Sequence, residues 1–127
     1  MTQSIRDFDR SFVCGSASLI TKQFYIVKQD TDGTLILSSA ATDKHVGVLL
    51  NKPAVGVSAL VRLGMGTCKV VAGGTITVGA WVTSDSNGKA VATTTNKDNV
   101  IGKFLGAASA ASGDIIEVQM DFFTLSS

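Results

Sequence analysis

Short runs of alternating apolar and polar residues recur along most of the chain and predict β-strands. The clearest run is 75–83, where Ile76, Val78, Ala80 and Val82 fall on one face of an extended strand. Further strand candidates are 19–28, 34–38, 46–50, 57–63, 70–74, 89–93, 99–105 and 114–122. Strands that recur every ten residues or so, with turn residues between them, are typical of an all-β sandwich or small barrel.

Two of the connections carry strong turn signals. The segments 29–33 and 84–88 both combine Asp with a final Gly, and the second contains Asn87-Gly88. Glycine adopts the positive φ that tight hairpin turns require, and Asn-Gly is among the strongest hairpin signals. Each segment is therefore predicted to join two antiparallel strands.

The chain also resembles itself at an offset of 55 positions. Residues about 22–65 and about 77–120 form the two copies, and the positions that agree are turn residues and apolar strand residues. The identical pairs are Val27 and Val82, Asp30 and Asp85, Gly33 and Gly88, Asp43 and Asp98, Gly47 and Gly102, Leu50 and Leu105, and Met65 and Met120. We therefore expect a compact β-barrel or β-sandwich built from two similar halves, forming a single domain over 18–127.

Residues 1–17 differ from this repeated body and are predicted to form an extended N-terminal arm. They mix charges with Phe8 and Phe12, and a Gly-Ser-Ala-Ser stretch follows at 15–18. A frayed terminus is one interpretation. The other is a docking arm, because two phenylalanines are costly to leave in water without a partner.

Composition narrows the possible partners. The 127 residues suit one domain, with 45% hydrophobic and 17% charged residues and a net charge of +1. The basic residues are scattered, whereas a nucleic-acid-binding surface would gather them. No stretch reaches the length of a membrane span. Neither nucleic acid nor a membrane is expected as a partner.

The residues that usually carry catalysis or bind metals are few and scattered. His45 is the only histidine, and we expect a solvated or capping residue at the edge of a strand. Cys14 and Cys68 are expected as small buried residues, although a bridge between them is the alternative. The Asp-rich turns lack the late carboxylate of a calcium loop. The sequence therefore predicts no catalytic residue, no cofactor, no metal and no small-molecule substrate.

Trp81 interrupts the alternation of its predicted strand. It falls on the face opposite Ile76, Val78 and Val82. It is expected either to cover a second small core or to anchor an interface, where tryptophan is over-represented.

The segment from Ala72 to Met120 resembles the small capsid decoration, or cement, proteins of tailed bacteriophages. The residues that carry the resemblance are AGGTITVGA at 72–80, VTSD at 82–85, NGKAVA at 87–92, DNVIG at 98–102, AASA at 107–110 and GDIIEV at 113–118. The first copy matches this pattern more loosely, and its Lys52-Pro53 loop departs from the alanine-serine loop of the second.

The resemblance implies a non-enzymatic virion protein. Such proteins are made in the host bacterial cytoplasm, sit as homotrimers on the outer capsid surface and hold neighbouring major capsid protein subunits together. Contacts are expected where the copies differ, at Arg6, Phe8, Arg10, Phe12, Lys52, Pro53 and Trp81. Deleting residues 1–15 is expected to leave a folded domain that no longer binds heads. A tail or fibre component and a carbohydrate-binding module are the alternatives.

Overall fold

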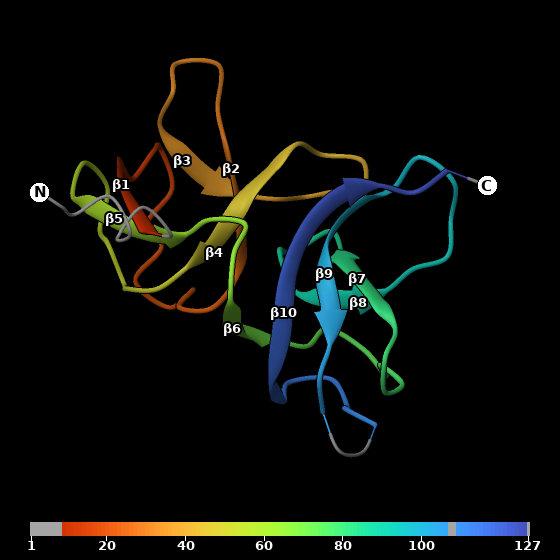
Figure 1. Ribbon diagram of the computed structural model, residues 1–127. Coiled ribbons are helices and arrows are strands. Elements are labelled where there is room, and N and C mark those ends of the chain that lie inside the picture. Colours follow the sequence, from red (N-terminus) through yellow and green to blue (C-terminus); the bar gives the residue numbers. More distant parts are fainter. Residues whose placement is uncertain (1–8, 107–108, 127) are drawn as a thin grey trace, which may run out of the picture.

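The computed structural model describes residues 9–106 and 109–126, which form ten strands in two five-stranded antiparallel sheets (Figure 1). The first sheet has the order β1 (Asp9–Val13), β5 (Ser58–Arg62), β4 (His45–Leu49), β2 (Ile26–Gln29) and β3 (Leu35–Leu37). The second has the order β6 (Thr67–Val71), β10 (Ile115–Thr124), β9 (Asn99–Phe104), β7 (Trp81–Ser84) and β8 (Ala90–Ala92). The all-β fold with two similar halves is confirmed.

Each sheet curls until its two edges meet at a single parallel bridge. The bridges join Cys14 to Leu35 in the first half and Ala72 to Ala90 in the second. One bridge does not make a ladder, so neither sheet closes into a barrel. Of the two predicted architectures, the molecule therefore has the sandwich-like one, made of two sheets.

The duplication extends to individual backbone hydrogen bonds, but the offset changes along the chain. It is 55 where Tyr25 N donates to Lys22 O and Ala80 N donates to Thr77 O. It is 57 between the donors Gly56 and Gly113, whose N–H groups bond to Cys14 O and Ala72 O respectively, so Gly56 corresponds to Gly113. It is 58 between the donors Gly15 and Gly73, whose N–H groups bond to Leu35 O and Ala90 O respectively. Loops of unequal length cause these changes.

The ungapped alignment consequently mispairs the strands that flank the central ones. Leu50 N donates to Leu60 O, and the equivalent bond joins Leu105 N to Glu117 O. Leu60 therefore corresponds to Glu117, not to Ile115. The predicted ends of the two repeats, Met65 and Met120, are consequently not equivalent positions.

The segment expected to form an arm belongs to the first sheet from Asp9 onward. β1 pairs with β5 just as β6 pairs with β10, so β1 is the first half's counterpart of β6. Phe12 packs against the first half's core, and Asp9 forms an ion pair with Arg62. Residues 1–8 lie outside the described part of the chain.

The strand expected over 75–83 is wrong in its first half. Thr77 O accepts a hydrogen bond from Ala80 N in a turn where Gly79 has a φ of 81°. Val78 is consequently 56% exposed, although the alternation placed it in the core. The strand expected over 19–28 is shortened in the same way, by a turn at Phe24 with a φ of 71°. The hairpin turns at Gly33 and Gly88, by contrast, are as predicted.

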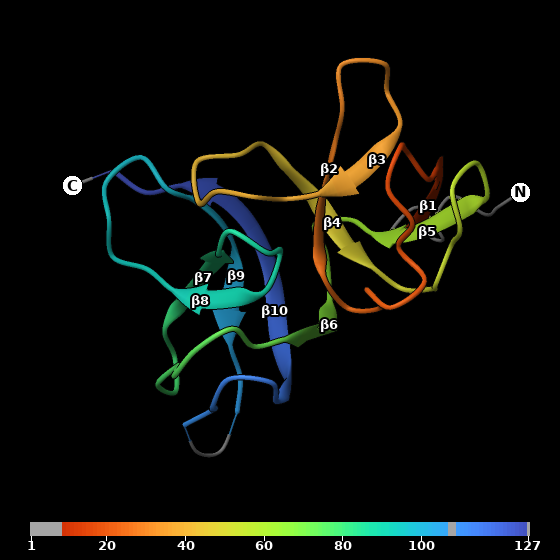
Figure 2. The same ribbon diagram turned by 180° about the vertical axis from the view of Figure 1, so that it is seen from behind.

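The two halves share a hydrophobic core, and Figure 2 shows them side by side from behind. One cluster lies inside the first sheet and includes Leu35, Leu49 and Val61. The other fills the second sheet and also contains Ile26 and Val48, from β2 and β4. The first half therefore buries side chains on both faces of its central strands.

Candidate partner-binding surfaces

Two of the four contact residues predicted for the N-terminal segment lie in β1. Arg10 is exposed, and its guanidinium carbon lies 5.1 Å from the centre of the Phe12 ring. Phe12 is itself half-buried against the core of the first half. Arg6 and Phe8 lie outside the described residues. β1 is thus an edge strand that exposes a charge while its aromatic residue anchors it.

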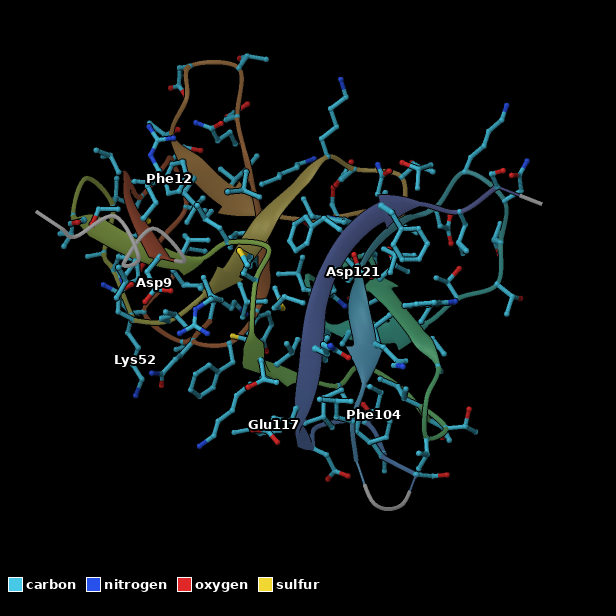
Figure 3. All side chains as sticks on the ribbon, in the orientation of Figure 1. Asp9, Phe12, Lys52, Phe104, Glu117 and Asp121 are labelled. Carbon is cyan, nitrogen blue, oxygen red and sulfur yellow. The ribbon has the colours of Figure 1, made fainter. Side chains whose placement is uncertain are left out.

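The Lys52-Pro53 pair divides between surface and interior. Lys52 is exposed on the connection between β4 and β5, on the same side of the molecule as Asp9 and Phe12 (Figure 3). Pro53 is buried, and its carbonyl accepts a hydrogen bond from Leu19 N. Only Lys52 of this pair is therefore available to a partner.

Trp81 is half-buried at the start of β7, in the second half. Its ring meets the Phe123 ring of β10 edge-on, with the ring centres 4.8 Å apart. This geometry is favourable for aromatic pairs. Trp81 lies in the second sheet and Arg10 and Lys52 in the first half, so the predicted contact residues that the structure describes do not form one surface.

Exposed apolar residues that the sequence interpretation missed occupy both halves. On the first half, Val13 is 52% and Leu60 is 37% exposed. Val57 is also exposed, and its carbonyl accepts a hydrogen bond from Cys14 N, next to Val13. In the antiparallel pairing of β1 with β5, Val13 is opposite Ser58, so Leu60 is its diagonal neighbour on the outward face. On the second half, Val78, Leu105 and Ile115 are exposed. The sequence contained a signal for the exposure of Leu60, because the equivalent residue of the second half is the charged Glu117.

His45 is buried where the halves meet, so the expectation of a solvated or capping residue is wrong. Its Nδ1 lies 2.8 Å from Ser38 Oγ, and its Nε2 lies 3.4 Å from Thr83 Oγ1 of the second half. The bulge that shifts β2 against β4 lies at this histidine. Burial lowers the pKa of His45 below its ordinary value, and the opposing effects of the Ala41 backbone and of Asp43 do not overcome it.

The charged neighbours of His45 are themselves paired. Asp43 Oδ2 lies 2.9 Å from Lys28 Nζ and accepts hydrogen bonds from the backbone N–H groups of Ser39 and Ala40. Although burial acts to raise the pKa of Asp43, these N–H groups and Lys28 lower it overall. A small hollow beside His45 is lined by Lys44, Asn99, Val100, Phe122, Phe123 and Thr124. The hydrogen-bonding partners of the imidazole are the hydroxyl groups of Ser38 and Thr83, and both of these residues are buried.

The cysteines are free and buried. Burial raises the pKa of the Cys68 thiol to about 11, so the thiol is almost entirely protonated near neutral pH. Within the described residues no group of three His, Cys, Asp or Glu side chains is placed to hold a metal ion. The same part of the chain contains no helix long and apolar enough to cross a membrane.

In the described part of the chain, the fold defines an all-β protein that exposes sheet edges and several apolar side chains. The chain matches the family model described as phage cement protein over residues 14–120. Because this match covers most of the chain, the protein belongs to that family and is a phage structural protein. The resemblance seen in the sequence is confirmed.

Among solved structures, the chain is similar to the N base of the head fiber gp8.5 of bacteriophage phi29. The TM-score is 0.69 at 20% sequence identity, and the similarity covers 94% of this chain and 99% of the phi29 chain. At this identity the likeness establishes a shared fold. No curated protein sequence matches the chain.

Proposed function

We propose that the protein binds the outer surface of a phage head and stabilises the contacts between major capsid protein subunits, without catalysing a reaction. Membership of the phage cement protein family over residues 14–120 carries the proposal. The buried, satisfied surroundings of His45 and Cys68 agree with a structural role. The protein acts as a homotrimer, and its partner is the major capsid protein.

In this proposal the protein stabilises the shell mechanically. Many copies on a symmetric shell stabilise it through the sum of modest contacts, so no single contact has to be tight. A rigid body suits this task because ordering it on the shell costs little conformational entropy. The continuous strand pairing of both sheets and the shared core supply that rigidity.

The N-terminal segment remains the proposed docking element, but its boundary has to move. A deletion of residues 1–15 would remove β1 and the buried Cys14, so it would expose the core of the first half. A deletion of residues 1–8 ends just before the sheet begins. This shorter deletion tests docking without removing a strand.

The test uses phage heads that lack the protein, to which purified full-length protein is added. We expect electron microscopy to show added density on the outer shell, and heads so decorated to resist heating better than bare heads. The 1–8 deletion variant should keep its circular dichroism spectrum and bind heads at least tenfold more weakly. Unchanged binding would exclude the N-terminal docking element, and full-length protein that never binds heads would exclude the function.

The phi29 neighbour favours one second candidate, the base of a head fiber. The structural similarity covers 99% of the length of that fiber base. In this alternative the protein also binds the head, but a longer fiber projects from it. Electron microscopy of heads from the intact phage distinguishes the two, because a cement protein ends as a compact knob whereas a fiber base carries a longer projection.

A further inference from the structure

The contact between the two halves of the chain joins two different faces. The first half contributes Gln23, Phe24, Ile26 and Leu50, which we call the joining face. Gln23 belongs to it because its Nε2 donates a hydrogen bond of 2.9 Å to Leu50 O. Phe24 O accepts a hydrogen bond of 3.0 Å from Val71 N at the outer edge of β6. Ile26 is fully buried in the shared core, and the partly buried Phe24 and Leu50 pack against that core.

The second half contributes the outer edge of β6 and the outward side of β6 and β10, which we call the receiving face. It includes Lys69, Val71 and Glu117, and Phe24 lines a hollow together with Lys69 and Glu117. The edge of a sheet offers unpaired backbone groups, and here the first half covers part of that edge.

This contact is one-directional. A reciprocal contact would bring the second half's equivalent of Phe24, which is Gly79, to the first half's equivalent of Val71, which is Val13. Among the described residues Gly79 and Val13 form no hydrogen bond with each other. The halves are therefore related head to tail, and each chain keeps one unused joining face and one unused receiving face.

Both unused faces expose apolar side chains. The second half's joining face consists of Val78, Trp81 and Leu105, which correspond to Gln23, Ile26 and Leu50. Leu105 is 43% exposed and Trp81 half-buried, whereas Ile26 is completely covered. The first half's receiving face consists of Ser11, Val13 and Leu60, which correspond to Lys69, Val71 and Glu117 and lie on β1 and β5. Where the used receiving face has a charged Glu117, the unused one has Leu60.

We propose that the joining face of one copy's second half docks on the receiving face of a second copy's first half, repeating between chains the contact made within each chain. Val78, Trp81 and Leu105 of one copy then cover Val13 and Leu60 of the next. A head-to-tail contact of this kind closes into a ring when its rotation permits. The inference rests on the proposed homotrimer and specifies the surfaces that join its subunits.

A second copy fits these faces better than the capsid does, because the contact is continuous with one that the molecule already makes. The same backbone framework meets the same strand edge inside the chain. Burial of Leu60 and Val13 against Leu105 and Trp81 replaces the mixed polar contact around Lys69 and Glu117 with an apolar one.

The test replaces a residue in one half by the residue found at the equivalent position of the other half. Leu60→Glu puts on the receiving face the residue found at the equivalent position 117, and Val78→Gln puts on the joining face the residue found at position 23. Since the other half carries these residues in the same backbone setting, both variants should fold. Met65→Gln, at an exposed residue between β5 and β6, is the matched control.

We expect sedimentation equilibrium to show a trimer for the wild type and for Met65→Gln. Leu60→Glu and Val78→Gln should each weaken association at least tenfold, with unchanged circular dichroism spectra. Cross-linking then tests the direction of the contact. Val13→Cys and Val78→Cys variants should form a disulfide only when mixed, because a head-to-tail contact pairs different faces; the native cysteines are buried.

Several results would overturn the inference. A wild type that stays monomeric at high concentration would overturn it. The proposed function is tested separately, by binding to phage heads, so its failure is distinguishable from this one. Trimers that survive both face variants would also refute it. If those variants stay trimeric but lose head occupancy, the faces contact the capsid instead. Self-cross-linking of either single cysteine variant would show a symmetric contact.

Discussion

At the scale of single residues, His45 connects the two halves as a neutral side chain. The Thr83 hydroxyl donates its proton to Asn99 O, 2.7 Å away, so towards the imidazole it acts as an acceptor. Nε2 therefore carries the ring proton, and Nδ1 accepts from the Ser38 hydroxyl. Both ring nitrogens are satisfied without a charge, and a proton added to this buried ring would have to be accommodated away from water.

This arrangement predicts a pH-dependent stability that His45→Gln should remove. The pKa of His45 is lowered from its ordinary 6.5 in the folded protein. As the pH falls below about 6.5 the unfolded chain therefore binds a proton first, and the free energy of unfolding decreases until the folded pKa is reached. Above that window the contribution of His45 is complete.

Urea unfolding of the wild type and His45→Gln at pH 7.5 and 5 measures the effect. The wild type should lose more stability than the variant between these values. Asp43 does not interfere, because its pKa is lowered from 3.8 and its contribution is lost only at still lower pH. Equal losses in both proteins would mean that His45 titrates normally.

At the scale of the strands, one glycine in each sheet allows two neighbouring strands to approach closely. Gly47 in β4 faces β5, and a Cβ atom placed there would lie 2.0 Å from Arg62 O. Gly102 in β9 faces β10, and its Cβ would lie 2.0 Å from Gln119 O. The same distance to equivalent atoms shows that the duplication conserves the spacing of the central strands.

We predict that Gly47→Ala and Gly102→Ala each lower the free energy of unfolding by about 3 kcal/mol or more, because a backbone oxygen cannot move aside without breaking the ladder. Gly74→Ala is the control, since its Cβ would meet nothing closer than Val91 Cγ1 at 3.9 Å. That substitution should change stability by only about 0.5 kcal/mol. Chemical denaturation of the three variants measures these changes in the free energy of unfolding. An alanine that is tolerated at either strand position would show that the strands can separate locally.

The sequence was sufficient to predict most strands, both hairpin turns and the two-part construction, because these depend on local alternation and turn residues. It could not reveal that Gly79 turns the chain inside the best alternating run, since glycine is compatible with either conformation. Nor could it predict the burial of His45, which depends on hydroxyl groups 7 and 38 positions away.

The candidate surfaces were predicted less well for a related reason. An ungapped repeat aligns Leu60 with Ile115, two apolar residues that look alike. The strand pairing instead aligns Leu60 with Glu117 and so reveals an exposed leucine where the other half has a charge. Of the residues predicted to make contacts, Arg10 and Lys52 are exposed, and Pro53 is buried, with its carbonyl bonded to Leu19 N.

At the scale of the whole molecule, the shared core ties the stability of each half to the other. Ile26 and Val48 of the first half are completely buried in the cluster that fills the second sheet. Backbone hydrogen bonds reinforce this connection, from Ile26 N to Gly88 O and from Asn99 N to Ala41 O. Separating the halves would expose this apolar surface and leave buried polar groups unpaired.

The protein should therefore unfold in one transition rather than half by half. Trp81, the only tryptophan, reports on the second half, and far-ultraviolet circular dichroism reports on both sheets. Leu49→Ala removes a fully buried side chain from the first half's own core and should cost about 2–5 kcal/mol. If the halves are one cooperative unit, this distant substitution shifts the Trp81 fluorescence transition in urea as far as the circular dichroism transition. A fluorescence midpoint that stays at the wild-type value would instead show that the second half folds independently, and the shared core would then contribute less than its burial implies.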